Sequence, residues 1–527
     1  MTSPRRPSLD RLVAALAGAP RESRALYRPV RRRELGLLLA AGILATAALA
    51  ALTLAHDGRL TSWWVAYLGL GFFALWALAH LAVRFFAPAA DPLLLPLAAA
   101  LNGIGLVMIH RIDLERQDAE KKAHRTVLSG VATSQLVWTL LALLLLAAVL
   151  VVLRNHNLLA RYTFTAGLAG LVLLVLPAAP VIGATINGAR LWLRVGPFTF
   201  QPSEVSKILL AIFLAGTMRP IGELEAAHHQ ARAGRAMRRG FLTGSSAAMT
   251  GMMTTTFNRI VTRVPFRRRL RMMAPALVVW AAGIGVLVIE RDLGSSLLFF
   301  GMFLVILYVA TQQGWLVGIG LVLFAGAATV SYYLFGHVRV RVDIWLHAFH
   351  GTNPSNESYQ LVQGLYGFAA GGLTGTGLGQ GQPNRVPFAN TDFIMASLGE
   401  ELGLTGVMAI LVLYLLLVVR GMRIALRTTD AFGKMIACAL SATIAFQVFV
   451  QVGGVMRLIP LTGVTLPFVS YGGSSLIANA VIIALLLRIS DSERRRAESP
   501  AAVNPDVVAD LPTTAHPKAT LTPDSSL

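Results

Sequence analysis

The sequence predicts an all-α polytopic membrane protein with about twelve membrane-spanning helices. Hydrophobic residues make up 55% of the 527 residues and charged residues only 14%, which is too apolar for a soluble chain of this length. Apolar runs of roughly 17 to 25 residues recur along the chain. Arginines gather between these runs, so the formal net charge of +20 indicates membrane topology and not a nucleic-acid partner.

The apolar runs place the helices in order along the chain. The predicted spans are 34–56, 62–86, 92–110, 134–154, 163–183, 203–218, 273–290, 293–311, 314–336, 395–420, 433–457 and 465–488. Basic clusters accumulate on the cytoplasmic side of membrane proteins. With the N-terminal arginines inside, the other basic clusters also fall inside, and both termini are predicted to be cytoplasmic.

Segments outside the spans have distinct compositions. Residues 1–33 form a basic cytoplasmic tail, and the full-length first span without a clear cleavage site is read as a retained helix, not a signal peptide. The basic segment 219–272 is predicted to be a cytoplasmic loop or amphipathic helix that anchors on anionic lipid. Residues 489–527 are predicted to be a disordered cytoplasmic tail. The single cysteine, Cys438, excludes an intrachain disulfide.

A long outer loop precedes the span at 203–218. It runs from Gly188 to Lys207, and Pro202 followed by a serine and Glu204 is a helix-start signature. Glu204 and Lys207 are three residues apart and share a helical face. Charges at a membrane helix end are costly unless they are satisfied, so these two residues are expected to hold the loop through a salt bridge, to contact a substrate, or to do both.

A second long outer loop covers 337–394 and is rich in glycine. Its glycines allow sharp turns and a close approach to a ligand, but no Walker sequence or dinucleotide fingerprint is present. Asp392 lies where this loop re-enters the membrane, where partial desolvation suits a general base, although it could instead cap the next helix. Glu400 and Glu401, two turns further on, are expected to join a buried polar network.

Two further polar features lie on this side. His347 and His350 have a spacing compatible with a metal, but no neighbouring ligand completes a zinc set. The segment 457–479 contains Pro460, Pro467 and two adjacent glycines. Broken backbone at membrane depth is tolerated only where protein or a cavity satisfies it, so this segment is expected to line the same site.

Five motifs occur in a fixed order. They are GAR-W with FQPSE--K at 188–207, DLGSSL at 292–297, YQL-Q with GGL-G-GLG at 359–379, TDFI---GEELG at 391–403, and P-TG--LPF-SYGGSSL at 460–476. Together they resemble the SEDS family of cell-wall polymerases, which includes the RodA and FtsW proteins, over about residues 92–488. The resemblance implies a ten-helix polymerase core at 92–488, preceded by two additional helices at 34–91.

The resemblance also implies an activity. Such proteins polymerise lipid II into peptidoglycan glycan strands on the outer face of the bacterial cytoplasmic membrane, with inversion and loss of undecaprenyl diphosphate. Asp392 matches the family's essential loop aspartate, as a base or as a ligand of Mg²⁺ or Mn²⁺. Implied partners are a class B penicillin-binding transpeptidase and other elongation or division machinery. The implied substrate-binding residues are Arg190, Gln201, Glu204, Lys207, Thr391, Ser470, Gly472 and Gly473.

The sequence departs from the family pattern at a few positions without losing a candidate catalytic group: Glu290, Arg291, Asn390, Met395 and Arg457. The sequence VPFA-TDFI and the two extra helices favour the RodA branch over FtsW. A lipid flippase or transporter is the alternative from another class, but no inverted repeat is evident and the polar groups cluster on one face. A catalytically silent scaffold for wall synthesis is a third alternative.

Overall fold

The structure is a computed structural model that describes residues 25–58, 63–122, 130–179, 182–186, 189–195, 198–242, 266–350 and 357–498. Most of the predicted N-terminal tail, the middle of the basic loop 219–272 and residues 499–527 of the C-terminal tail lie outside the described residues. The prediction of a disordered tail from residue 489 was wrong for 489–497, which continue the last helix. Within the described part, twelve helices are long and apolar enough to cross a membrane. This confirms the predicted all-α, multi-pass fold class.

The elements alternate between long helices and short connections. The long helices are α3 (Arg28–Asp57), α4 (Trp63–Phe86), α5 (Leu94–Lys122), α6 (Val131–Val152), α7 (Thr163–Val175), α8 (Pro202–Leu242), α10 (Phe266–Ile289), α11 (Leu293–Thr311), α12 (Gly314–Leu334), α15 (Ile394–Arg427), α16 (Ala431–Val455) and α17 (Gly473–Ala497). The connections contain η1 (His156–Tyr162), η2 (Leu176–Ala178), β1 (Gly183–Ile186), β2 (Ala189–Val195), β3 (Phe198–Phe200), α13 (Gly336–His347), α14 (Tyr359–Gly371) and η4 (Pro383–Arg385).

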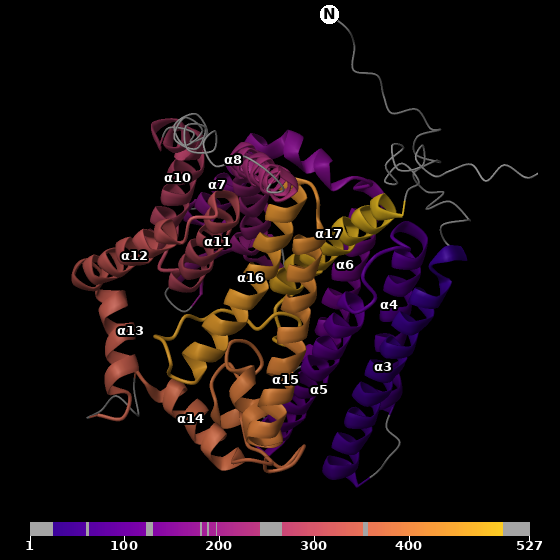
Figure 1. Ribbon diagram of the computed structural model, residues 1–527. Coiled ribbons are helices and arrows are strands. Elements are labelled where there is room, and N and C mark those ends of the chain that lie inside the picture. Colours follow the sequence, from indigo (N-terminus) through magenta and orange to yellow (C-terminus); the bar gives the residue numbers. More distant parts are fainter. Residues whose placement is uncertain are drawn as a thin grey trace, which may run out of the picture.

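The most buried spanning helices are α5, α16 and α17. In their most apolar windows 83%, 83% and 78% of the residues are buried inside the protein, whereas none of the window of α12 is. In Figure 1, α3 and α4 lie at one edge of the bundle and α12 at the other, with α16 between them. The apolar surface of α12 therefore suits contact with lipid, while α16 is positioned to carry polar groups away from lipid.

The bundle has two ends, which we name by their residues. The terminal face is the end where Tyr27, before α3, contacts Glu498, after α17. The loop face is the opposite end, which holds α13, α14, Asp392 and the small sheet between α7 and α8. Sequence-distant connections therefore meet at each face because successive helices alternate in direction.

Several predicted boundaries were wrong, and one predicted loop contains a sheet. Helix α5 continues to Lys122, beyond the predicted end at residue 110, because Arg111 pairs with Glu401 inside the protein at 2.9 Å. Helix α17 begins at Gly473, not at 465, and the backbone before it has positive φ at Arg457 and Phe468. The outer loop before α8 contains an antiparallel sheet of order β1-β2-β3.

The two N-terminal helices are fastened to the rest of the bundle at both ends. Near the terminal face, Arg31 pairs with Glu34 and donates to the carbonyl of Ala90, and His80 Nδ1 lies 2.7 Å from Glu34 Oε1. Near the loop face, His56 Nε2 lies 2.7 Å from an oxygen of Asp118 on α5. Arg31, Glu34 and His80 are buried, and removing any one of them would leave a buried charge or polar group without its partner.

Candidate functional site

Asp392 lies in the turn that leads into α15 on the loop face. The N-cap position of α15 is Phe393, and no side chain caps this helix, so the alternative role of Asp392 as a helix cap was wrong. Its carboxylate accepts a hydrogen bond from the Thr391 hydroxyl at 3.0 Å. Burial raises the pKa of Asp392 above its ordinary value, and the Thr391 hydroxyl and the Arg341 charge offset only part of this effect.

Three backbone contacts fix the position of Asp392. Gln451 Nε2 on α16 donates to the Asp392 carbonyl at 2.7 Å, and the Ser470 hydroxyl donates to the Thr391 carbonyl. The Tyr471 amide donates to the carbonyl of residue 390 at 2.8 Å. The predicted residues Thr391 and Ser470 are therefore brought together with Asp392. Thr391 binds the Asp392 carboxylate and Ser470 binds the neighbouring backbone, and any contact of these two residues with substrate stays a prediction.

Arg341 on α13 is a site residue that sequence reasoning missed. Its guanidinium donates to the carbonyls of Leu461 and Thr462 at 3.0 and 3.3 Å, and it attracts the carboxylates of both Asp292 and Asp392. Asp292 caps α11 through Ser295, while its second carboxylate oxygen is buried without a hydrogen bond among the described residues. Arg341 is thus a shared cation for two carboxylates that are one hundred positions apart in the sequence.

Glu204 and Lys207 form the predicted pair at the start of α8. Lys207 Nζ lies 2.6 Å from Glu204 Oε2, and both side chains are buried. The same ammonium donates to Gln447 Oε1 at 2.9 Å, and Gln447 Nε2 donates to the Thr465 carbonyl at 3.0 Å. The predicted salt bridge between Glu204 and Lys207 is therefore present, and a contact of these residues with substrate remains a prediction. The adjacent Gln201 holds Ser474 through its backbone amide at 3.0 Å.

Helix α16 joins these two groups. Gln447 contacts Lys207, and Gln451, one turn later, contacts the Asp392 carbonyl. Residues four apart lie on the same helix face, so one side of α16 connects the charged pair to the aspartate. The sequence signal for Gln447 and Gln451 is two glutamines four residues apart in a largely apolar span. Polar side chains within a membrane helix are costly unless they are hydrogen-bonded, so they mark candidate site residues.

Arg190 is not brought to Asp392 by any described contact. It lies on β2, where its guanidinium Nη2 donates to the Ala179 carbonyl at 3.0 Å and its Nε is buried without a partner in the described chain. Gly472 precedes α17, and Gly473 packs against Trp138, because a Cβ at Gly473 would come within 2.3 Å of the indole ring. Close packing thus accounts for Gly473, and the substrate role of these three residues stays a prediction.

The glycine-rich loop packs on the start of α15. Gly379 donates its amide to Glu401 Oε2 at 2.9 Å, and Gln382 donates its amide to Glu400 Oε1 at 2.8 Å. Arg111 completes the set by donating to the Gly381 carbonyl at 2.8 Å. Gly375 has φ +85°, and a Cβ there would clash with the Glu401 carbonyl. The close approach that the glycines allow is therefore to α15, and Glu400 and Glu401 are the expected buried network.

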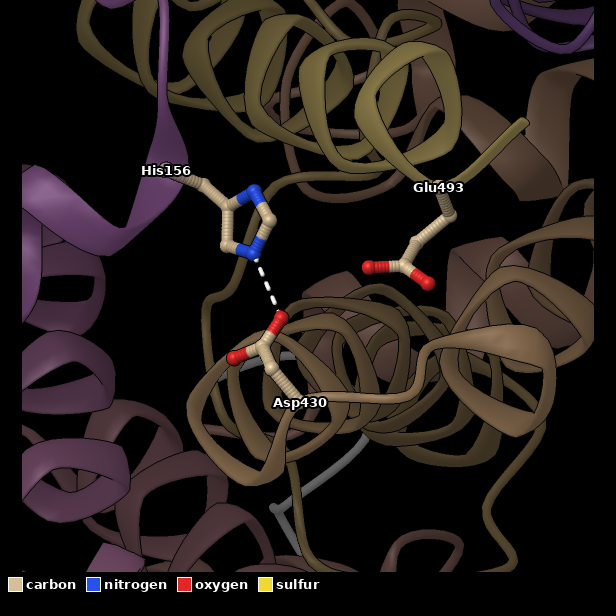
Figure 2. Close-up of side chains that lie close together, drawn as sticks. All are labelled: His156, Asp430 and Glu493. Carbon is tan, nitrogen blue, oxygen red and sulfur yellow. Dashed lines mark hydrogen bonds and ion pairs between the residues drawn. The ribbon is translucent and has the colours of Figure 1, made fainter. Parts of the chain in front are cut away.

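One described group of side chains could hold a metal ion, and it does not include Asp392. His156, Asp430 and Glu493 have potential ligand atoms within 4.8 Å of one another, and Figure 2 shows them converging from three elements at the terminal face. The two histidines on the loop face belong to no such group in the described chain, and His347 instead contacts Asp343 at 2.9 Å.

Hydrogen bonds within the protein engage each member of the terminal-face group, although His156 Nδ1 is buried without a partner among the described residues. His156 Nε2 lies 2.7 Å from Asp430 Oδ2, as the dashed line in Figure 2 marks, and Asp430 Oδ1 accepts from the Gly433 amide at 2.7 Å. Glu493 accepts from the Thr429 amide at 3.1 Å. Burial alone would raise the pKa of Asp430, but the bonds from His156 and Gly433 lower it below its ordinary value. The group therefore links η1, α16 and α17.

Comparison with known proteins identifies the family. The family model described as cell cycle protein, FtsW/RodA/SpoVE, matches residues 92–495. The peptidoglycan glycosyltransferase RodA of Mycobacterium tuberculosis is 45% identical over 469 residues, which cover 89% of this chain and 92% of that protein. The probable peptidoglycan glycosyltransferase FtsW of Geobacter metallireducens is 31% identical over 407 residues, covering 76% of this chain and 94% of that protein.

A solved structure supports the same fold. It is described as "Structural coordination of polymerization and crosslinking by a peptidoglycan synthase complex", and it superposes with a TM-score of 0.53 at 25% identity. The superposition covers 77% of this chain and 98% of that chain. Sequence motifs, family model and fold agree, and the chain is a multi-pass membrane protein that belongs to the FtsW/RodA/SpoVE family.

Proposed function

We propose that this protein is a RodA-type peptidoglycan glycosyltransferase that polymerises lipid II into glycan strands. The observation that carries the proposal is the state of Asp392. Its carboxylate is half-buried, has a raised pKa and does not cap a helix, and its backbone carbonyl is held by Gln451. The higher identity to a RodA than to an FtsW relative favours the elongation branch. The relatives described above are named as glycosyltransferases and not as flippases, so they do not favour the flippase alternative.

The reaction needs a base. The 4-hydroxyl of an acceptor sugar attacks the anomeric carbon of the lipid-linked donor, the carbon–oxygen bond to the diphosphate breaks with inversion, and the hydroxyl proton goes to Asp392. An aspartate whose pKa is raised above its ordinary value is a stronger base than an ordinary aspartate when it is ionised. The fixed Asp392 backbone positions the carboxylate for this transfer.

The leaving diphosphate needs positive charge. Lys207 and Arg341 are two cations of this region, and the family resemblance implies Arg190 as a further one. In the alternative role of Asp392, its carboxylate would hold a divalent cation such as Mg²⁺ or Mn²⁺, which would stabilise the charge that develops on the diphosphate. A single aspartate fits this arrangement, because Mg²⁺ commonly takes one or two carboxylates and completes its shell with substrate phosphates and water.

Location and partners follow from the same proposal. The loop face is assigned to the outside of the bacterial cytoplasmic membrane and the terminal face to the cytoplasm, because the arginine clusters favour cytoplasmic termini. Residues 92–488 would form the polymerase core and 34–91 an added helix pair. A class B penicillin-binding transpeptidase is the proposed partner, since the solved neighbour is described as a synthase complex for polymerisation and crosslinking.

Polymerisation by purified protein tests this function. Asp392→Asn keeps the side-chain shape but removes the base, so glycan chain formation from lipid II and Mn²⁺ should fall to background. The matched control is Asp343→Asn, an exposed aspartate on the same face, which should retain activity. Polymerisation by the Asp392→Asn protein would exclude Asp392 as the base. Transfer of labelled lipid II across vesicle membranes without any polymerisation would favour the flippase alternative, and neither activity would favour the scaffold.

A further inference from the structure

A cavity at the terminal face is not used by the proposed reaction. It has a volume of about 400 Å³ and lies between the end of α15, the end of α17 and the connection that precedes α5. Four arginines line it, three from α15 and one from α17: Arg420, Arg423, Arg427 and Arg494. Such a concentration of guanidinium groups around one hollow is a site for a negatively charged ligand if the arginines are not already neutralised.

The carboxylates that line the same cavity are already engaged. Asp91 forms an ion pair with Arg420 and also accepts from the Leu93 amide at 2.9 Å. Glu493 accepts from the backbone and hydroxyl of Thr429 at 3.1 Å. Glu498 accepts from the hydroxyl of Tyr27. These contacts immobilise the acidic groups, and Arg420 is the one cavity arginine that forms an ion pair within the described residues.

Arg423 and Arg427 are the cations that remain. Both are exposed, and neither has a hydrogen bond or an ion pair in the part of the chain that the structure describes. They stand four residues apart on the last turns of α15, so they project from one helix face and repel each other. The negative end of the α15 dipole favours a basic residue there, but it does not explain two arginines beside a cavity.

We propose that this cavity binds the phosphate of an anionic phospholipid headgroup. The arginines lie at the end of a membrane-spanning helix, which is the depth of the lipid headgroups. The planar guanidinium fork matches phosphate oxygens in a bidentate manner. Basic pockets between spanning helices on the cytoplasmic side are suited to anionic headgroups, whereas a freely diffusing phosphate gains nothing from the adjacent membrane. The inference is independent of the glycosyltransferase proposal.

Lipid titration of the full-length protein in a neutral detergent tests the cavity. The probes are short-chain phosphatidylglycerol, phosphatidylcholine with the same chains, and inorganic phosphate, and the readout is bound lipid counted by native mass spectrometry. Arg423→Gln with Arg427→Gln should weaken phosphatidylglycerol binding about 10- to 30-fold, since each arginine near a lipid surface contributes about 1 kcal/mol. The charge-retaining Arg423→Lys with Arg427→Lys should lose less.

A matched control removes the same charge elsewhere. Arg33→Gln with Arg161→Gln takes two exposed arginines that do not line the cavity, and phosphatidylglycerol binding should stay within about twofold of the unmodified protein. Melting temperatures in lipid-free detergent confirm that all variants are folded. Equal losses in the cavity and control variants would overturn the site, as would equal binding of phosphatidylcholine. Saturation by inorganic phosphate at concentrations where the lipid does not bind would overturn the lipid assignment.

Discussion

Asp392 and Asp430 occupy similar places in the sequence and opposite environments in the structure. Each lies within two residues of the start of a membrane-spanning helix, α15 and α16 respectively. Asp430 caps its helix and pairs with His156, and its pKa is lowered. Asp392 caps nothing, and burial raises its pKa. A carboxylate whose oxygens are fully bonded is a structural part, whereas an under-bonded one is available to exchange a proton.

Removing the Asp392 carboxylate is expected to have the largest effect. Asp392→Ala should lower polymerisation from lipid II about 10³-fold, in the range of a lost general base. Its melting temperature should stay the same or rise, because the ionised carboxylate is costly to keep half-buried. Activity and thermal unfolding measured on one preparation check both. A large drop in melting temperature would show that Asp392 has a structural role, as Asp430 does.

Metal removal should affect the loop face and not the terminal face. Exhaustive chelation with EDTA is expected to lower polymerisation at least about 10²-fold, with recovery on adding Mg²⁺ or Mn²⁺. The melting temperature should not change, since His156, Asp430 and Glu493 are held by hydrogen bonds without an ion. A chelator-induced fall in melting temperature would show instead that the terminal-face group holds a structural metal.

Truncating Asp430 should act on stability alone. Asp430→Ala removes both a helix cap and the partner of the buried His156, so the free energy of unfolding should fall by about 2 kcal/mol. Because the folded pKa is lowered, this stabilisation is present above the ordinary aspartate pKa and is lost as the pH falls through the lower folded value. Acid unfolding of both proteins measures it, and polymerisation at neutral pH should remain within about twofold.

Arg341 is expected to lower the pKa of Asp392. Arg341→Gln removes the cation that lowers the pKa of Asp392, so the pKa should rise and the acid limb of the pH–rate profile should move to higher pH. We expect the loss of activity to be largest on the acid side of the profile and to shrink as the pH rises, with about a tenfold loss at most on the acid limb. Arg339→Gln, an exposed arginine on the same helix, is the control and should leave the profile in place. An unshifted acid limb in Arg341→Gln would contradict the role.

The smallest expected effect concerns Glu290, beside Asp292. Burial first, and then the Asp292 charge, raise the pKa of Glu290 to about 7. The folded protein therefore loses stability as the pH rises from the ordinary glutamate pKa through about 7. Glu290→Gln should raise the free energy of unfolding by about 1 kcal/mol at pH 8 and have no effect near pH 4, an amount discounted for partial exposure. Equal effects at both pH values would refute the assignment.

Much of the fold could be predicted because hydropathy acts locally. The apolar runs located all twelve spanning helices, and the errors fell where a charge has a distant partner, as for Arg111 and Glu401. The motif order identified the family, and it drew attention to Asp392 and to the Glu204–Lys207 pair. Arg341 escaped notice because an arginine in a long loop is ordinary until the fold places it beside two carboxylates.

Chain length, apolarity and residue order are properties of the chain alone, so they suffice to show that this protein crosses the membrane repeatedly and carries the family's motifs. Which carboxylates are satisfied is a property of the folded protein. Asp392 and Asp430 could both have been helix caps, and Glu400 and Glu401 could have faced a ligand. Burial and hydrogen-bond partners set these roles, and both depend on segments that lie from tens to hundreds of residues apart.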